Sequence, residues 1–398
     1  CVPGSRRCNP QTGVPQLCGG SGAYQNQTPC RTGEVCTASG NTTSCTCQNN
    51  LTACQSGCFD LNTDASNCGS CGHSCQGSTC SAGRCNPTTI ASGQVVASRM
   101  ALNTNELFFA TTGGDLYRIT KEGAGLRAIV ISSNVRGLAA DGTTVYWTLD
   151  ETPGQIWRVT QSGNGTLTNY ANSPDGLGGY AYRYLVDIAS GGGSIKTDAV
   201  YVSGGSVYWV DGGYRRASTT ASIPASGELL GEAISSFSTT SLMAPAGTCV
   251  YGVDSSLMGI VRACTGGGQA SVYSGNLIMD IVADSSAVYF SEHSIGIKRM
   301  ALNSTTPTIT NLAPTSAVPL SLTTDQNFVY YIDGGATADL CSPNMTIKRV
   351  AKSGGTPTTL VQLGSNACPK VVSVDDTFLY YATWDDPGTG GAISRVAK

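Results

Sequence analysis

The sequence predicts an all-β fold: a seven-bladed β-propeller preceded by a small N-terminal disulfide-rich domain. Three observations support this prediction. Ser and Thr make up 88 of the 398 residues, whereas the helix formers Glu and Lys number seven each. A short apolar-aromatic motif recurs seven times, at intervals close to the roughly 40–45 residues of a four-stranded propeller blade. Fourteen of the 18 cysteines lie within the first 85 residues, which is typical of a small domain held by disulfides.

The charge content argues against several classes of partner. Lys and Arg number 23, Asp and Glu number 26, and the formal net charge is −3. Because only 12% of the residues are charged, we expect no basic surface that could neutralise nucleic-acid phosphates or anionic lipid. The sequence has no run of about 18 apolar residues, so we also expect no transmembrane segment.

The cysteine-rich region divides into two modules, residues 1–48 and 49–87. Disulfides persist only in an oxidising compartment, so we expect an extracellular or cell-surface protein. Either a secretion leader was removed before Cys1, or the numbering begins at a mature end. Each module holds seven cysteines, so at least one bridge must join the modules if all of them are paired. The cysteines are Cys1, Cys8, Cys18, Cys30, Cys36, Cys45 and Cys47 in the first module and Cys54, Cys58, Cys68, Cys71, Cys75, Cys80 and Cys85 in the second.

An N-terminal cysteine is also what a processed bacterial lipoprotein carries. A lipid on Cys1 would leave an odd number of cysteines in this region, whereas all 14 pair without remainder. We therefore expect Cys1 to form a disulfide, with a lipid anchor as the alternative.

The second module has a recognisable cysteine spacing between Cys54 and Cys75. It resembles the cysteine-rich repeats of secreted myxobacterial proteins and, more distantly, the stigma-specific cysteine-rich family of plants. The resemblance implies an extracellular interaction or spacer module without catalysis. Cys68, Cys71 and Cys75 with His73 have a spacing that suits zinc. A disulfide framework is the simpler interpretation of so cysteine-rich a segment, and we expect no metal.

From residue 88 onwards the repeat has two elements. The first is the apolar-aromatic triplet, which begins at Leu107, Val145, Val207, Val250, Val288, Val329 and Leu379. The second follows about ten residues later and places an arginine between apolar residues, where we expect a structural role. These arginines are Arg118, Arg158, Arg262, Arg299, Arg349 and Arg395. In the third copy the second element is degenerate and reads Tyr214-Arg215-Arg216-Ala217.

Each repeat predicts four antiparallel strands in a fixed order. An inner strand ends at a turn residue such as Asp284, Asp325 or Asp375, the triplet forms the second strand, the arginine lies in the third, and a Thr-rich segment forms the outer edge. The last repeat stops after its arginine strand. Residues 88–97 match the missing edge strand in type, so we expect them to close a propeller that spans residues 88–398.

One repeat carries a family resemblance. Val145-Tyr-Trp-Thr-Leu-Asp150, followed by Ile156-Trp-Arg158, resembles the strand signature of the YWTD-type β-propellers of the low-density-lipoprotein-receptor class. The resemblance implies a propeller that binds protein ligands and has no shared catalytic group. The chain departs from that family by having seven copies instead of six and by altering the tetrad in other copies.

The four remaining cysteines fit this scheme. Cys249 and Cys264 flank a hairpin, which places them opposite each other on the second and third strands of one blade. Cys341 falls in a loop between a second and a third strand, and Cys368 falls in the connection to the next blade. Both loop types emerge on one face of a propeller, so each pair can form a bridge.

We expect the working surface to be the face that carries the loops after the second strands and the connections between blades. Residues 172–197 lengthen one such connection as a long loop and bring three tyrosines, Tyr180, Tyr182 and Tyr184, which offer large contact area. Carboxylates at the ends of the second strands would make the same face acidic. The candidate acidic binding residues are Asp150, Asp211, Asp333, Asp385 and Asp386.

These carboxylates have two interpretations. They could hold a basic ligand or a cation, with calcium at Asp385 and Asp386 as one reading. Alternatively, each carboxylate caps a turn or pairs with a repeated arginine, as a device common to all repeats would do. We favour the second interpretation and expect no cofactor.

Three classes of function remain. The first is a secreted, non-enzymatic protein whose propeller loops bind a protein or a glycan. The second is a structural subunit of an extracellular filament or surface assembly, in which the cysteine-rich domain docks on a neighbouring propeller. The third is a propeller hydrolase or lyase. His73 and His293 are the only histidines. Because few imidazole groups are available as a general base, we expect no enzyme.

Overall fold

A computed structural model describes the arrangement of most of the chain. The described residues are 1–48, 50–93, 96–130, 135–142, 144–149, 155–162, 166–167, 183–187, 200–210, 213–219, 228–232, 242–254, 256–302, 307–314, 318–334, 345–364, 367–385 and 390–398. They form strands and turns without a helix, which confirms the all-β prediction. Among them, no helix is long and apolar enough to cross a bilayer. The chain forms two compact units: unit 1 contains Cys1–Thr88 with Ala397, and unit 2 contains Thr89–Val396 with Lys398.

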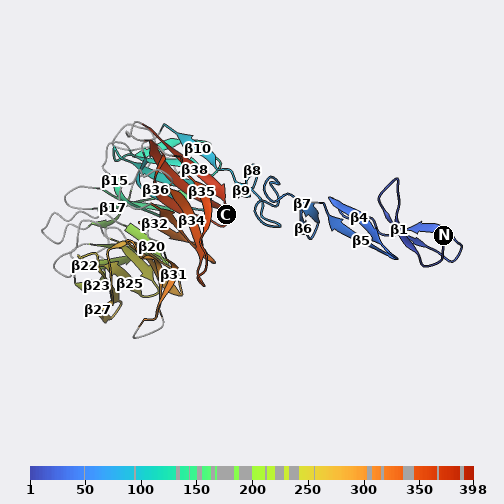
Figure 1. The fold of residues 1–398 in the computed structure, drawn as a ribbon. Helices are drawn as coiled ribbons and strands as arrows, with labels where there is room; N and C mark the ends of the chain where they lie inside the picture. The colour runs from blue at the N-terminus through green and yellow to red at the C-terminus, as the bar shows by residue number, and fades with distance from the viewer. Residues whose placement is uncertain are drawn as a thin grey trace. The chain divides into compact units, whose positions relative to one another are not determined.

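Unit 1 is built from short strands (Figure 1). The first three form one antiparallel sheet, and the others pair as hairpins. The sheet contains β1 (Arg6–Cys8), β2 (Pro15–Cys18) and β3 (Tyr24–Asn26), and the hairpins are β4 (Glu34–Ser39) with β5 (Thr42–Cys47), β6 (Thr52–Cys54) with β7 (Gly57–Phe59), and β8 (Cys80–Ser81) with β9 (Arg84–Cys85).

Seven disulfides hold unit 1 together, because strands this short bury little hydrocarbon. The bridges are Cys1–Cys18, Cys8–Cys36, Cys30–Cys45, Cys47–Cys58, Cys54–Cys71, Cys68–Cys80 and Cys75–Cys85. The Cys47–Cys58 bridge links the two modules, as the odd cysteine count in each module requires. The lipid-anchor alternative is wrong for this structure, because the Cys1 thiol is bonded to Cys18.

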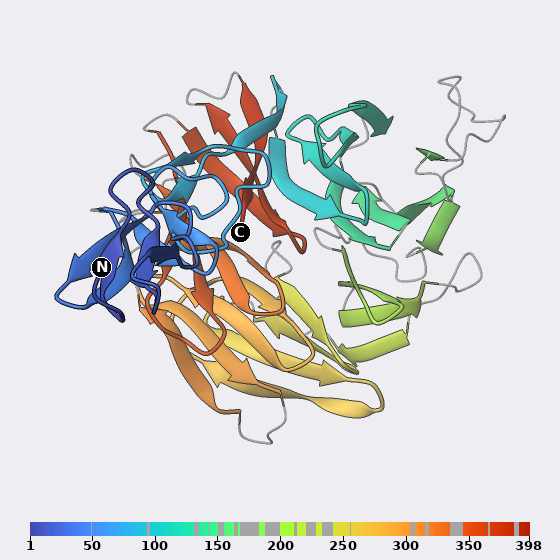
Figure 2. The same cartoon turned by 90° about the vertical axis from the view of Figure 1, so that its right-hand side faces the viewer.

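The described residues of unit 2 form seven antiparallel sheets, which are arranged around a central axis (Figure 2). Sheet 1 has β11 (Val96–Leu102), β12 (Glu106–Thr111), β13 (Leu116–Thr120) and β14 (Arg127–Val130). Sheet 2 has β15 (Val135–Asp141), β16 (Thr144–Leu149), β17 (Gln155–Ser162), β18 (Thr166–Leu167) and β19 (Arg183–Asp187). Sheet 3 has β20 (Val200–Ser203), β21 (Ser206–Val210), β22 (Gly213–Ser218) and β23 (Glu228–Glu232).

The remaining sheets follow the same order. Sheet 4 has β24 (Met243–Ala246), β25 (Cys249–Val253), β26 (Gly259–Cys264) and β27 (Gly267–Ser274). Sheet 5 has β28 (Ile278–Ala283), β29 (Ala287–Glu292), β30 (Gly296–Ala301) and β31 (Ile309–Pro314). Sheet 6 has β32 (Pro319–Thr324), β33 (Phe328–Asp333), β34 (Thr346–Ala351) and β35 (Thr358–Gln362). Sheet 7 has β36 (Ala367–Val374), β37 (Phe378–Asp385), β38 (Gly391–Ala397) and β10 (Thr88–Ser92).

The sheets close into a ring, which makes unit 2 a β-propeller. The first strand of each sheet contacts the first strand of the next, and β36 of sheet 7 contacts β11 of sheet 1. Sheet 7 combines both ends of unit 2, because β10 pairs with β38 as its outer strand. The outer strand is shorter than the expected residues 88–97: it ends at Ser92, Gly93 turns the chain with a φ of 75°, and Val96 already begins the innermost strand of sheet 1.

The core lies between neighbouring sheets and is built from the second strands. Their apolar-aromatic triplets are buried, with Trp147 and Trp209 among the largest fully buried side chains. Trp147 of sheet 2 packs with Phe108 of sheet 1 in one apolar cluster. A second cluster joins β10 and β38 to sheet 1 through Ile90 and Ile393 among others. Burial of the triplets between sheets therefore explains why they recur at blade spacing.

The repeated arginines lie opposite the middle residue of the triplets. Arg158, Arg262, Arg299 and Arg349 each face a tyrosine of the second strand, and Arg118 faces Phe108. In the degenerate third copy, Arg216 occupies this position opposite Tyr208. Two of the arginines also reach the next sheet: Arg158 donates to the Thr219 carbonyl, and Arg395 Nη1 donates to the Lys121 carbonyl at 2.7 Å.

The antiparallel order assigns the loops to two faces. The turns between first and second strands and between third and fourth strands lie on one side, which we call the turn face. The loops between second and third strands and the connections to the next sheet lie on the other side, which we call the loop face.

A repeated charge network spans neighbouring sheets at the turn face. In three sheets the aspartate of the first turn accepts hydrogen bonds from the tyrosine at the middle of its own triplet (2.7–3.0 Å) and from a lysine of the next sheet (2.5–2.9 Å). The sets are Asp284, Tyr289 and Lys352; Asp325, Tyr330 and Lys398; and Asp375, Tyr380 and Lys121. The last set crosses the junction between sheets 7 and 1, so it reinforces ring closure.

We expect Lys121→Ala to destabilise unit 2 by about 1–3 kcal/mol, because it leaves a partly buried Asp375 carboxylate without its lysine partner. Urea denaturation of the full chain measures this change. Arg127→Ala is the matched control, since Arg127 is an exposed cation on the next strand of the same sheet. Equal destabilisation by the two substitutions would contradict a role of Lys121 in closure.

The same network predicts acid sensitivity. Burial alone would raise the pKa of Asp325, but hydrogen bonds from Lys398 and Tyr330 lower it from 3.8 to about 2. A carboxyl with a depressed pKa stabilises the fold fully above its ordinary value of 3.8, and this contribution is lost as the pH falls towards 2. We expect Asp325→Asn to be less stable than wild type at pH 6. At pH 2 we expect a smaller difference in urea midpoint between the two proteins. An equal gap at both pH values would refute this assignment.

Candidate functional site

Three loop-face segments of sheets 4 and 5 are joined by backbone hydrogen bonds. Gly275 N–H donates to the Met258 carbonyl at 2.7 Å, Ile278 N–H to the Leu257 carbonyl at 2.6 Å, and His293 N–H to the Leu277 carbonyl at 2.8 Å. The loop after β25, the connection from sheet 4 to sheet 5 and the loop after β29 therefore form one surface. We call residues 256–258, 275–278 and 292–295 the loop platform.

A buried carboxylate anchors the loop platform from below. Glu292 at the end of β29 is 1% exposed. Its Oε1 accepts hydrogen bonds from the Tyr273 hydroxyl at 2.6 Å and from Asn276 N–H at 3.1 Å. Its Oε2 pairs with Lys298 Nζ at 2.5 Å, and Lys298 also donates to the Tyr273 hydroxyl at 2.7 Å. These bonds connect the third strand of sheet 5 to the end of sheet 4.

The pKa shifts of Tyr273 and Lys298 favour the protonated forms that donate hydrogen bonds to Glu292. Burial raises the pKa of Tyr273, and its hydrogen bond to Glu292 raises it further. Burial alone would lower the pKa of Lys298, but its bonds to Glu292 and Tyr273 raise it above its ordinary value. At neutral pH the phenol is therefore neutral and the ammonium is charged, so both donate hydrogen bonds to Glu292 and neither is poised as a base.

The upper side of the loop platform exposes aliphatic side chains. Met258 is 51% exposed and Ile295 is 38% exposed. Each follows a residue in the left-handed region, Leu257 with φ 58° and Ser294 with φ 59°. Among the described residues of unit 2, Leu126 at the turn face is the only other exposed large hydrophobic residue. The loop platform thus exposes two aliphatic side chains, each next to a turn residue with positive φ.

His293 does not meet a carboxylate in the described contacts. It is half-buried in the loop platform, and its Nδ1 lies 2.9 Å from the hydroxyl of its neighbour Ser294.

The described carboxylates at the ends of second strands are paired or capped. Asp333 forms an ion pair with Lys348, and Glu292 forms one with Lys298. Asp254 accepts from the Ser256 hydroxyl at 2.6 Å in its own turn. For Asp333 and Glu292 the partner is the lysine that precedes the repeated arginine, Lys348 or Lys298, instead of the arginine itself. Asp333 and Glu292 are therefore charge-paired, and Asp254 caps its own turn.

Several predicted binding residues lie outside the described residues. These are Tyr180, Tyr182, Asp150, Asp211 and Asp386. Asp385 is the last residue of β37, where the backbone alone is described. The calcium reading at Asp385 and Asp386 therefore stays a prediction.

The expected loop over residues 172–197 is wrong in part. Residues Arg183–Asp187 form β19, and Tyr184 lies opposite Trp157 of β17 in sheet 2. The strand β18 covers only Gln161 and Ser162 of β17, so the rest of that edge needs another partner. A segment reading Arg-Tyr-Leu-Val-Asp has the residue types that supply one.

The late cysteines agree with their expected positions where they are described. Cys249 and Cys264 face each other on β25 and β26 and form a disulfide. Cys368 is buried and disulfide-bonded. Cys341 lies outside the described residues, so the Cys341–Cys368 bridge stays a prediction.

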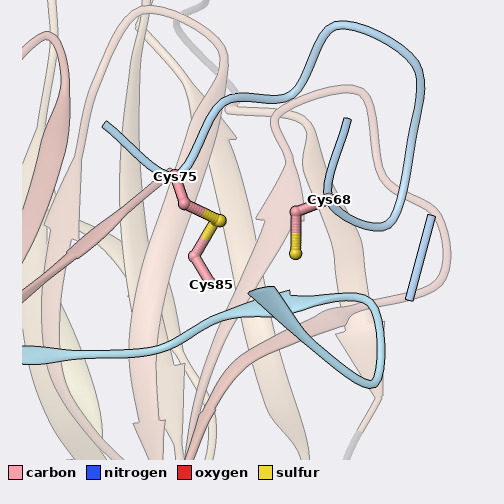
Figure 3. A group of neighbouring side chains, drawn as sticks. All are labelled: Cys68, Cys75 and Cys85. Atoms are coloured by element: carbon pink, nitrogen blue, oxygen red, sulfur yellow. A yellow bond between two sulfur atoms is a disulfide. The ribbon is translucent and has the colours of Figure 1, made fainter. Parts of the chain in front are cut away.

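The cysteines considered for zinc are committed to disulfides. Figure 3 shows the sulfur atoms of Cys68, Cys75 and Cys85 close together, with Cys75 bonded to Cys85. Cys68 is bonded to Cys80, and Cys71 to Cys54. None of these sulfurs is a thiolate, so this group cannot bind zinc as proposed for free cysteines.

Comparisons with known proteins show the fold. No protein-family model matches the chain, and no curated protein sequence matches it. The structure of YCF48 bound to D1 peptide has a TM-score of 0.56 and 8% identity and covers 79% of this chain and 95% of that one. The WD40 β-propeller domain of Doa1 has a TM-score of 0.53 and 9% identity, covering 78% and 96%. The computationally designed Ika8 protein has a TM-score of 0.52 and 15% identity, covering 78% and 98%. At these identities the similarity establishes a β-propeller and nothing finer.

Gly275→Ala tests the packing of the loop platform. A Cβ at this position would overlap both the Glu292 carboxylate and the Tyr273 hydroxyl. We expect it to lower stability by about 1–3 kcal/mol, as overpacking does, with a change in the tyrosine near-ultraviolet dichroism. Gly364→Ala is the control, because Gly364 lies in the corresponding connection between sheets 6 and 7 and an added Cβ there meets nothing within 4 Å. Equal losses of stability in Gly275→Ala and Gly364→Ala would show that the Glu292 network does not confine Gly275.

Proposed function

We propose that the chain is a secreted, non-enzymatic binding protein that uses the loop platform to hold a protein partner. The observation that carries this proposal is the pair of exposed aliphatic side chains, Met258 and Ile295, on a surface fixed by three backbone hydrogen bonds and a buried ion pair. A rigid apolar surface loses little conformational entropy on binding, and methionine adapts its shape to a partner.

A protein partner is favoured over a glycan by the type of exposed side chain. The described large hydrophobic residues exposed on the loop face are aliphatic, whereas sugar rings are best met by aromatic faces. Charge adds little, since the nearby carboxylates Asp254 and Glu292 are committed to internal bonds. The YCF48 structure named above holds a peptide, which supports a propeller of this size as a scaffold for a polypeptide ligand.

Secretion and family kinship are further parts of the proposal. The disulfides support an extracellular or cell-surface location, and eight of them join two described cysteines. Kinship with YWTD-type propellers is supported by the Val145–Asp150 motif, whose Trp147 is buried in the second strand of sheet 2.

Self-assembly is the second candidate. Unit 1 exposes Val2 at 75% and also exposes Val35, which are apolar contacts that a neighbouring copy could cover. Sedimentation of the full chain at increasing concentration separates a monomer that binds another protein from a subunit that binds its own kind.

The proposal is tested by screening the full chain against an array of extracellular proteins and glycans. We expect Met258→Ser with Ile295→Ser to weaken binding to a protein hit by tenfold or more, because each side chain supplies about 1 kcal/mol or more at an interface. Leu126→Ser is the control, as Leu126 is 40% exposed on the opposite, turn face. Unchanged affinity of the double variant, or hits confined to glycans, would refute the assignment.

A further inference from the structure

The centre of the propeller holds a cavity of about 360 Å³. It is lined by the first strands of six of the sheets, mainly through aliphatic side chains and backbone. Three ionisable side chains interrupt this lining: Arg99 from β11, Tyr201 from β20 and Asp280 from β28. They come from sheets 1, 3 and 5, so they enter the cavity from different sides.

Local backbone irregularity accounts for the position of the two charged residues. The pairing of β11 with β12 shifts register between Val96 and Met100, and the pairing of β28 with β29 shifts between Ile278 and Asp280. A bulge re-aims the side chains beside it. Arg99 and Asp280 both lie at these bulges, each four residues before the turn residue of its sheet.

The Asp280 carboxylate is held in one orientation by the cavity wall. Its Oδ1 accepts from Ile281 N–H at 2.8 Å, and its Oδ2 accepts from Leu322 N–H of the next sheet at 2.6 Å. Ser321 repeats the arrangement one sheet further on, where its hydroxyl accepts from Val372 N–H at 3.1 Å. Ser321 has a φ of 42°, so this wall includes strained backbone.

The three ionisable groups act on one another. Burial raises the pKa of Asp280, while its backbone hydrogen bonds and the charge of Arg99 oppose that rise. Tyr201 is influenced by both Arg99 and Asp280, and its hydroxyl oxygen accepts from Met243 N–H. A phenol oxygen that accepts this bond can still donate its own proton to a ligand. Each carboxylate oxygen of Asp280 also keeps capacity to accept a second hydrogen bond.

We propose that this cavity binds a small zwitterion of the α-amino-acid class, with the ligand carboxylate at Arg99 and Tyr201 and its ammonium group at Asp280. Donors of positive charge on one side and a fixed carboxylate on the other match a molecule that carries both charges close together. A ligand with one charge would satisfy only one side and would be repelled by the other. This site is independent of the loop platform.

Isothermal titration of the full chain at pH 7 tests the proposal with three probes. L-alanine carries both charges, N-acetyl-L-alanine lacks the ammonium charge and L-alaninamide lacks the carboxylate. We expect saturable binding of L-alanine and at least tenfold weaker binding of each of the other two. Absence of binding by L-alanine, or equal affinity for all three probes, would overturn the proposal.

Two variants assign the ends of the ligand. The Arg99→Gln variant should bind L-alanine and L-alaninamide with similar affinity, because it has lost the partner of the ligand carboxylate. The Asp280→Asn variant should bind L-alanine and N-acetyl-L-alanine with similar affinity, because it has lost the partner of the ligand ammonium group. Ser373→Ala is the control, because Ser373 lines the same cavity without a charge, and it should behave as wild type. The Met258→Ser and Ile295→Ser double variant should also bind L-alanine normally, which separates this site from the loop platform. If a charge variant fails to fold, the wild-type comparison of the three probes still decides the outcome.

Discussion

The propeller depends on the backbone hydrogen bonds between β10 and β38. They join strands far apart in sequence, and the side-chain hydroxyls of Thr89 and Ser394, 305 residues apart, also lie 3.3 Å from each other across this pair of strands. Without β10 the outer edge of β38 would be open, and an open edge exposes unpaired amides and carbonyls. The Lys121 contacts with Asp375 and Arg395 cross the same junction, so charge and backbone pairing reinforce the one point at which the ring is not continuous in sequence.

Both faces of the propeller contain ion pairs between a carboxylate and a lysine, but these pairs connect different parts of the structure. At the turn face, aspartates such as Asp284 bind a lysine of the next sheet, which ties neighbouring sheets together. At the loop face, Glu292 binds Lys298 within its own sheet and draws in the connection from sheet 4 through Tyr273 and Asn276. The first arrangement links neighbouring sheets by ion pairs and hydrogen bonds. The second leaves an ordered surface above it, which is where a partner can bind at small entropic cost.

Some functional residues were missed although the sequence carries a signal for them. Lysines follow the repeated arginine by three residues in sheets 1, 6 and 7, as Arg118 and Lys121 illustrate, and this recurrence points to the network of the turn face. The role of Lys298 had no such signal, because a lysine on a strand is commonly solvated. The sequence also carries no signal for Arg99 and Asp280, because a period-two pattern does not reveal the bulges beside which these residues line the cavity.

The sequence by itself determined the all-β class, the seven triplet copies, the paired cysteines of unit 1 and the hairpin bridge between Cys249 and Cys264. These features are local or periodic, so spacing and parity are sufficient to read them. Only the tertiary structure decided which lysine pairs with which carboxylate, that Arg183–Asp187 is an edge strand, and which charged residues meet at the centre. Those outcomes depend on register shifts and on contacts between sheets, and both arise from packing of residues far apart in the chain.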